Sequence, residues 1–153
     1  MKYLLAFLLA LASGNTMAAD NNPPIINIDD NNKEMNLAIE KGKNTFHQFE
    51  ANWKTLKNNG YSIKVAMKND DGGIEHIWFN PIEINQENIV ARCANEPGKI
   101  SGLKLGDKRT INKSDVSDWM IVVGNKCYGG YTIRVLAKLD PDNAPPFEFV
   151  DFK

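Results

Sequence analysis

The chain has 153 residues, a hydrophobic fraction of 42%, a charged fraction of 24% and a formal net charge of −1. This length and composition are typical of one globular domain that buries a core of its own. Because the charges are nearly balanced, no broad basic surface is available for nucleic-acid phosphates or anionic lipid head groups. We therefore expect neither nucleic acid nor an anionic membrane surface as a partner.

The N-terminus has the three-part layout of a secretory signal peptide. Lys2 is a short positive segment, residues 3–12 (YLLAFLLALA) are uncharged and apolar, and small residues follow up to Ala19. The apolar run is too short for a membrane-spanning helix, which needs about 20 residues. The pattern predicts a signal peptide over residues 1–19, cleaved after Ala18 or Ala19, and a mature chain without a membrane span.

The next part of the chain indicates a lead-in and a helix. Residues 20–32 (DNNPPIINIDDNN) are rich in Asn, Asp and Pro, which indicates a flexible segment before a single domain over residues 33–153. From Lys33 to Lys57 apolar residues recur at spacings of four and three, which predicts one long helix with one apolar face. Gly42 lies on that face; since glycine costs about 1 kcal/mol of helix propensity, we expect a neighbouring element to approach closely there.

After Gly60 the apolar period changes from about 3.6 to 2, which predicts strands. The first two are expected over residues 61–68 and 74–79, with a turn of hairpin type between them. Further strands are predicted over residues 82–84, 88–93, 108–111, 119–123 and 126–135, the last with a break at Gly129–Gly130. The sum is an α+β domain in which one long N-terminal helix packs on a meandering antiparallel β-sheet.

Cys93 and Cys127 lie in two of the predicted strands. In an exported protein two cysteines favour a disulfide over a redox or metal pair, and two ligands do not complete a structural zinc site. We therefore expect a Cys93–Cys127 disulfide, which would stabilise the fold by about 3–4 kcal/mol. The alternative is two separate buried thiols.

The sequence contains no recognisable catalytic, metal or nucleotide motif. Its two histidines are His47 and His76, and it lacks HExxH spacing, a phosphate-binding glycine loop and a GxSxG elbow. We expect no cofactor and no metal. In a strand, Glu75 and His76 point to opposite faces and cannot form a local acid–base pair, whereas His76 and Trp78 share a face. That face is either a recognition surface or part of the structure.

A second group of candidates lies near the C-terminus. If Trp119 and Arg134 are neighbours across the last predicted hairpin, the guanidinium can stack on the indole ring or pair with Asp118. A structural interpretation is an Arg–Asp tie that holds a strand end. A functional interpretation is a ligand or partner site in which Arg134 grips an anion.

Five segments, in this order, resemble the pattern of the YegJ-like family, a bacterial domain of unknown function. They are Lys33–Ile39 (KEMNLAI), Gly73–Trp78 (GIEHIW), Leu105–Asp107 (LGD), Ser117–Met120 (SDWM) and Gly129–Arg134 (GGYTIR). The resemblance covers roughly residues 33–136. It implies an α+β bacterial domain with no established activity and no accepted catalytic residues. As a hypothesis, its characteristic polar and aromatic residues converge at one end of the sheet: Glu75, His76, Trp78, Asp107, Asp118, Trp119, Tyr131 and Arg134.

Together these patterns predict a small exported, non-enzymatic binding or interaction domain of the bacterial periplasm, with an unidentified protein, peptide or envelope component as its partner. The candidate binding residues are His76, Trp78, Asp118, Trp119, Tyr131 and Arg134. One alternative is a hydrolase-like enzyme in which His76 acts with Asp118 or Asp107. Another is an enzyme inhibitor or immunity-type protein, a role that suits small secreted domains.

Overall fold

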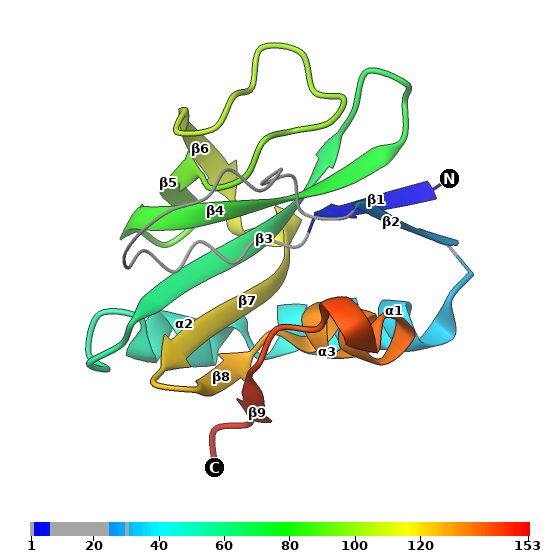
Figure 1. Cartoon of the computed structure of the whole chain (residues 1–153). Coiled ribbons are helices and arrows are strands. Elements are labelled where there is room, and N and C mark those ends of the chain that lie inside the picture. Colours follow the sequence, from blue (N-terminus) through cyan, green and yellow to red (C-terminus); the bar gives the residue numbers. More distant parts are fainter. Residues whose placement is uncertain (1, 7–24, 30) are drawn as a thin grey trace, which may run out of the picture.

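The computed structural model describes residues 2–6, 25–29 and 31–153, and it has the mixed α+β fold that the sequence predicts (Figure 1). The helices are α1 (Lys33–Asn44), α2 (Phe46–Asn52) and α3 (Tyr131–Leu139). The strands are β1 (Lys2–Ala6), β2 (Ile25–Asp29), β3 (Gly60–Lys68), β4 (Ile74–Ile84), β5 (Asn88–Cys93), β6 (Lys108–Asn112), β7 (Val116–Val123), β8 (Lys126–Gly129) and β9 (Glu148–Val150). The strands β1 and β2 fall in the segments predicted as signal peptide and lead-in, and both cleavage positions lie outside the described residues.

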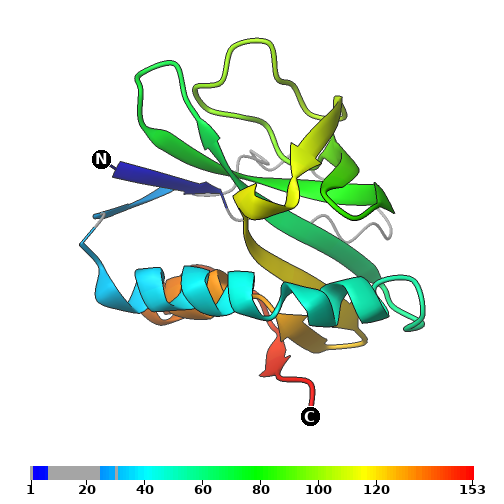
Figure 2. The same ribbon diagram turned by 180° about the vertical axis from the view of Figure 1, so that it is seen from behind.

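The strands form one sheet in the order β2-β1-β4-β3-β7-β8-β9, and β5 and β6 continue from the second half of β4. Neighbouring strands are antiparallel except for the β1–β4 and β8–β9 pairs, which are parallel. The three helices lie together along one side of the molecule. In Figure 2, which views the molecule from behind, α1 and α2 run across the front and α3 lies behind them.

The prediction of one long N-terminal helix is wrong, because the helix is divided at Thr45. This residue has φ −103° and ψ 5°, outside helical geometry. Its hydroxyl donates to the carbonyl oxygen of Lys41 at 2.7 Å and accepts from the indole Nε1 of Trp119 at 3.0 Å. A buried indole N–H needs an acceptor. The break therefore supplies a partner for a tryptophan of the sheet.

The core lies between the sheet and the helices. Ile63 of β3 is opposite both Phe79 of β4 and Trp119 of β7, so these side chains share one face. All three are fully buried, and the ring of Trp119 lies 6.0 Å from the ring of Phe49 in α2. The apolar stripe of the predicted helix therefore does pack on the sheet, although two shorter helices carry it.

The last predicted strand is also corrected. The predicted break at Gly129–Gly130 is present, with β8 ending at Gly129, but the residues after it form the helix α3 from Tyr131 and not a strand. Gly129 and Gly130 have φ of 73° and 62°, a left-handed conformation that glycine adopts at little cost and that turns the chain out of the sheet. A Cβ on Gly129 would lie 2.6 Å from the Trp119 ring. The double glycine thus ends the strand and starts the helix.

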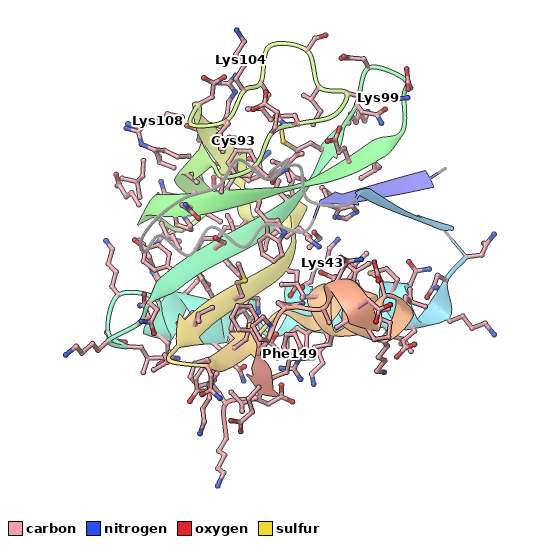
Figure 3. The ribbon with its side chains drawn as sticks, in the orientation of Figure 1. Lys43, Cys93, Lys99, Lys104, Lys108 and Phe149 are labelled. Atoms are coloured by element: carbon pink, nitrogen blue, oxygen red, sulfur yellow. The ribbon has the colours of Figure 1, made fainter. Side chains whose placement is uncertain are left out.

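The predicted disulfide is wrong. Cys93 and Cys127 are both free thiols and both buried. They lie on β5 and β8, which β4, β3 and β7 separate, so that four strand spacings, about 19 Å, lie between them along the sheet. A disulfide needs Cα atoms within about 7 Å. Cys93, in the upper part of the molecule (Figure 3), donates instead to the carbonyl oxygen of Asn95 at 3.1 Å, and burial raises the pKa of Cys127 to about 12.

The close approach expected at Gly42 is confirmed. A Cβ built on this residue would lie 2.6 Å from the carbonyl oxygen of Ser117 and 2.9 Å from the Cα of Asp118. Both atoms belong to the backbone of β7 and cannot rotate away. Glycine is therefore required where α1 crosses β7.

We predict that Gly42→Ala destabilises the protein, although alanine normally favours a helix over glycine by about 1 kcal/mol. The clash with β7 should lower the free energy of unfolding by about 1–3 kcal/mol, measured by urea denaturation. The control is Gly60→Ala, since nothing lies within 4 Å of its added Cβ; its effect should stay within about 0.5 kcal/mol. A Gly42→Ala protein as stable as the parent would contradict the packing described.

Candidate functional site

A row of three side chains crosses the sheet on one face. Lys64 of β3 lies opposite Trp78 of β4 on one side and Asp118 of β7 on the other. All three are buried, with at most 2% of any of them exposed, and Lys64 Nζ lies 4.8 Å from the centre of the Trp78 ring. His76, two residues before Trp78, is on the same face and 2% exposed. With two hydrogen-bonding neighbours they form a buried polar cluster: Lys64, His76, Trp78, Ser117, Asp118 and Thr132.

Asp118 joins the sheet to α3. Its carboxylate accepts from the backbone N–H of Trp119 at 2.8 Å, of Tyr131 at 3.2 Å and of Thr132 at 2.8 Å, and from the Thr132 hydroxyl at 2.6 Å. The N-cap residue of α3 is Gly130, which has no side chain to accept these bonds. Asp118 of β7 therefore caps α3, and its charge is favourably placed at the positive end of the helix dipole.

Lys64 reaches the same carboxylate through Thr132. Its Nζ donates to the Thr132 hydroxyl at 2.8 Å, and that hydroxyl donates to Asp118. Burial lowers the pKa of Lys64 to about 7, while the charge of Asp118 acts in the opposite direction. Burial also raises the pKa of Asp118, against the effect of Lys64 and the hydrogen bonds from Thr132 and Trp119. The charge of Asp118 therefore favours the protonated form of Lys64, and the charge of Lys64 favours the ionised form of Asp118.

His76 is held by Ser117. The His76 Nδ1 lies 2.8 Å from the Ser117 hydroxyl, which also donates to the carbonyl oxygen of Lys64 at 3.2 Å. Burial lowers the pKa of His76 to about 3, with further lowering by the charges of Lys64 and Lys43. Figure 3 shows Lys43 between the helices and the sheet. The imidazole is therefore neutral at pH 7.

Trp119 and Tyr131, two other candidates, lie in the core. They are 0% and 4% exposed, and their rings meet edge to face with centres 5.9 Å apart. Next to them, Arg134 lies with its guanidinium 4.8 Å from the centre of the Tyr131 ring. These three candidates form one aromatic and cationic group at the start of α3, in which only Arg134 is partly exposed.

Arg134 does not pair with Asp118, so that interpretation is corrected. Its Nη2 donates to the carbonyl oxygen of Val150 at 2.9 Å and to Asp151 Oδ1 at 2.8 Å, and its Nε donates to the carbonyl oxygen of Gly129 at 3.1 Å. These bonds fasten the C-terminal strand β9 to the start of α3. The guanidinium of Arg134 is thus hydrogen-bonded to groups of this same chain.

The remaining two characteristic residues hold the loop between β5 and β6. Glu75 accepts from the backbone N–H of Gly98 at 2.6 Å and of Lys99 at 3.0 Å. Asp107 accepts from the N–H of Lys104 at 3.1 Å and pairs with Arg109. Figure 3 places Lys99 and Lys104 at the top of the molecule, beyond the sheet from Lys43. The eight characteristic residues therefore do not converge at one place.

The sequence did not identify Lys64, Ser117 and Thr132 as members of a buried cluster. Lys64 alternates with apolar residues in its strand, a pattern that normally places a lysine in solvent. Its burial depends on Asp118 in the neighbouring strand and on Thr132 in α3, at sequence distances that local periodicity does not connect. One signal for the cluster was present in the sequence: Lys64 and Asp118 each lie in a strand whose other face is apolar.

Among the described residues, no three or more His, Cys, Asp or Glu side chains come together in a way that could hold a metal ion. In the same part of the chain, none of the helices has the length and apolar character needed to cross a membrane.

We predict a pH dependence of stability that originates at His76. Because its pKa is about 3 in the folded protein and about 6.5 when unfolded, only the unfolded chain takes up a proton between these values. The contribution of His76 to stability is therefore fully present above about pH 6.5 and is lost as the pH drops, by up to about 1.4 kcal/mol per pH unit. Urea midpoints of the parent and of His76→Asn between pH 7 and 4.5 measure this; the variant should have the shallower slope. Equal slopes would show that His76 is not buried in its neutral form.

The comparisons with known proteins place the chain among bacterial proteins. The family model "Uncharacterized protein conserved in bacteria (DUF2314)" matches residues 32–144. The chain is 34% identical to "Uncharacterized protein YegJ" of Escherichia coli (strain K12) over 76 residues, which are 50% of this chain and 49% of that protein. It is 30% identical to "Putative ankyrin repeat protein NMB1133/NMB1171" of Neisseria meningitidis serogroup B (strain ATCC BAA-335 / MC58) over 118 residues, 71% of this chain and 47% of that protein.

The chain therefore spans about half the length of the curated relatives it matches. No solved structure matches it. The family match includes every helix, the strands β3 to β8 and the whole buried polar cluster, and with the similarity to YegJ it confirms the predicted resemblance. The chain belongs to the bacterial family DUF2314.

Proposed function

We propose that the protein is an exported, non-enzymatic binding domain of the bacterial periplasm. Its export is supported by the signal-peptide layout of residues 1–19 and by the bacterial family to which it belongs.

The observation that carries the binding role is the use of the reactive side chains as structural groups. Lys64 and Asp118 are 0% exposed, and they are linked through Thr132 to the first turn of α3. A catalytic acid or base must come within hydrogen-bonding distance of its substrate. Because these groups are inside the protein and bonded to one another, we assign them to the architecture and place recognition at the surface.

The expected outcome of export is a periplasmic chain that begins at Ala19 or Asp20. Cell fractionation and N-terminal sequencing measure this directly. Leu8→Arg introduces a charge into the apolar run and should leave uncleaved protein in the cell interior, whereas Leu8→Ile should be exported like the parent. Uncleaved parent protein in the cytoplasm would contradict the proposal.

A second candidate is a serine hydrolase, which one observation favours. The Ser117 hydroxyl and His76 Nδ1 lie 2.8 Å apart, the distance of an activated nucleophile and its base. Three features weigh against it: Ser117 is 0% exposed, its hydroxyl has a second acceptor in the carbonyl of Lys64, and a pKa of about 3 makes His76 a weak base. The acids expected for such an enzyme have other partners: Asp118 accepts from the Thr132 hydroxyl, and Asp107 accepts from the N–H of Lys104.

A fluorophosphonate probe separates the two candidates, because it modifies activated serines covalently. We expect no labelling of the folded protein, as for a binding domain. Labelling of the parent that disappears in Ser117→Ala, but persists in the exposed-serine control Ser114→Ala, would establish the hydrolase instead. Mass spectrometry of the intact protein provides the measurement.

A further inference from the structure

The first half of β4 has an edge that only β1 covers in the described structure. On one side, β4 pairs with β3 along residues 74–79. On the other side, β5 pairs with β4 from Phe79 onward. Before that point the neighbour is β1, which runs parallel to β4 with Leu4 opposite Glu75 and Leu5 opposite His76. Figure 1 shows β1 entering the sheet beside this end of β4.

The direction of the backbone groups along this edge follows from Trp78. Its N–H donates to Asn95 Oδ1 at 2.7 Å and its carbonyl oxygen accepts from the N–H of Ala94 at 2.8 Å, both on the side away from β3. In a strand the N–H and C=O of every second residue point to the same side. The backbone groups of Ile74 and His76 therefore point away from β3 as well, toward β1.

The strand β1 lies within the predicted signal peptide. Cleavage after Ala18 or Ala19 would remove it, and β2 pairs with β1 alone. The backbone groups of Ile74 and His76 would then form a sheet edge, and such an edge accepts further strands. We propose that in the exported protein this edge binds an extended apolar peptide segment of a partner protein, which adds to the sheet as a strand parallel to β4. The proposal rests on the export proposed above.

The strand that occupies the edge in the described structure indicates which kind of peptide the edge binds. β1 is five residues long and has the sequence KYLLA, with apolar residues after its lysine. The edge lies between the bond from Trp78 to Asn95 and the β3–β4 turn at Gly72–Gly73, and β1 pairs there with Glu75 and His76. Strand addition uses main-chain hydrogen bonds for affinity and side-chain contacts for specificity.

The exposed apolar side chains offer no competing surface among the described residues. The large ones are Leu37, Ile82, Leu105 and Leu139, which are 43–65% exposed. They come from α1, β4, the loop before β6 and the end of α3, and single exposed apolar residues of this kind are ordinary. The edge of β4 is therefore the better place for a partner.

The test uses the chain from Asp20 to Lys153, which lacks β1. Circular dichroism first establishes that it is folded. The probe is a fluorescent peptide, KYLLA followed by two lysines for solubility, and its binding is measured by fluorescence anisotropy. The matched control peptide carries proline at the position of Leu5, which removes a backbone N–H and should weaken binding at least tenfold. The full-length chain, whose own β1 covers the edge, should bind the probe at least tenfold more weakly.

A variant of the protein tests the same edge. Ile74→Pro removes an N–H that points away from β3, so it should weaken peptide binding at least tenfold, whereas Ile74→Val keeps the N–H and should bind as the parent does. Absence of binding to the folded chain, or equal binding of the proline peptide, overturns the proposal even if Ile74→Pro does not fold. Since the purified chain already begins at Asp20, these outcomes are independent of export; uncleaved protein in cells overturns the export proposal alone.

Discussion

The carboxylate of Asp118 is the point at which the sheet, the first helix and the last helix meet. It accepts three backbone N–H groups and the Thr132 hydroxyl, so that β7 and the first turn of α3 share one set of hydrogen bonds. Gly42 of α1 lies against the backbone of the same residue. From α3, Arg134 extends the connection to the C-terminal strand. The elements far apart in the sequence are therefore fixed relative to one another through a single buried side chain.

A buried carboxylate is costly unless its charge and its hydrogen-bonding capacity are both satisfied. The N–H groups of α3 and the positive end of its dipole satisfy part of this requirement, and Lys64 supplies a counter-charge through Thr132. Removing one member of such a pair typically costs about 3–5 kcal/mol, since the other is left buried without its partner. The cluster thus constrains the fold, which explains why residues that resemble a catalytic set are completely enclosed.

The sequence predicted those features that depend on local periodicity. The apolar stripe that includes Gly42 indicates which side of the helix faces the core, and the alternation around Ile63 does the same for β3. The change of period after Gly60 indicates where β3 begins. The features that failed depend on distant residues. The helix is divided at Thr45, whose hydroxyl accepts from the indole of Trp119, 74 residues later. The assignment of residues 131–135 to a strand failed because a short apolar run fits a strand and a helix equally well.

The candidate site, too, was predictable where local periodicity was sufficient and not where distant residues meet. Sequence patterns identified His76, Trp78 and Asp118, which do lie on one face, but gave no strand order, and without that order Lys64 has no visible partner. The failed disulfide has the same origin, because two strands that each carry a cysteine are at opposite ends of the path β5-β4-β3-β7-β8. Side-chain chemistry can be inferred along a strand, whereas its neighbours depend on the topology.

The cluster and the edge of β4 belong to one arrangement, because the cluster fixes the strand that carries the edge. Ser117 of β7 holds His76, and Lys64 of β3 lies against Trp78. A shift of β4 by one residue would turn both side chains to the opposite face and break these contacts. The backbone groups at Ile74 and His76 are therefore held in position before any partner arrives. A preformed edge loses little conformational freedom when a strand is added, so more of the hydrogen-bond energy contributes to affinity.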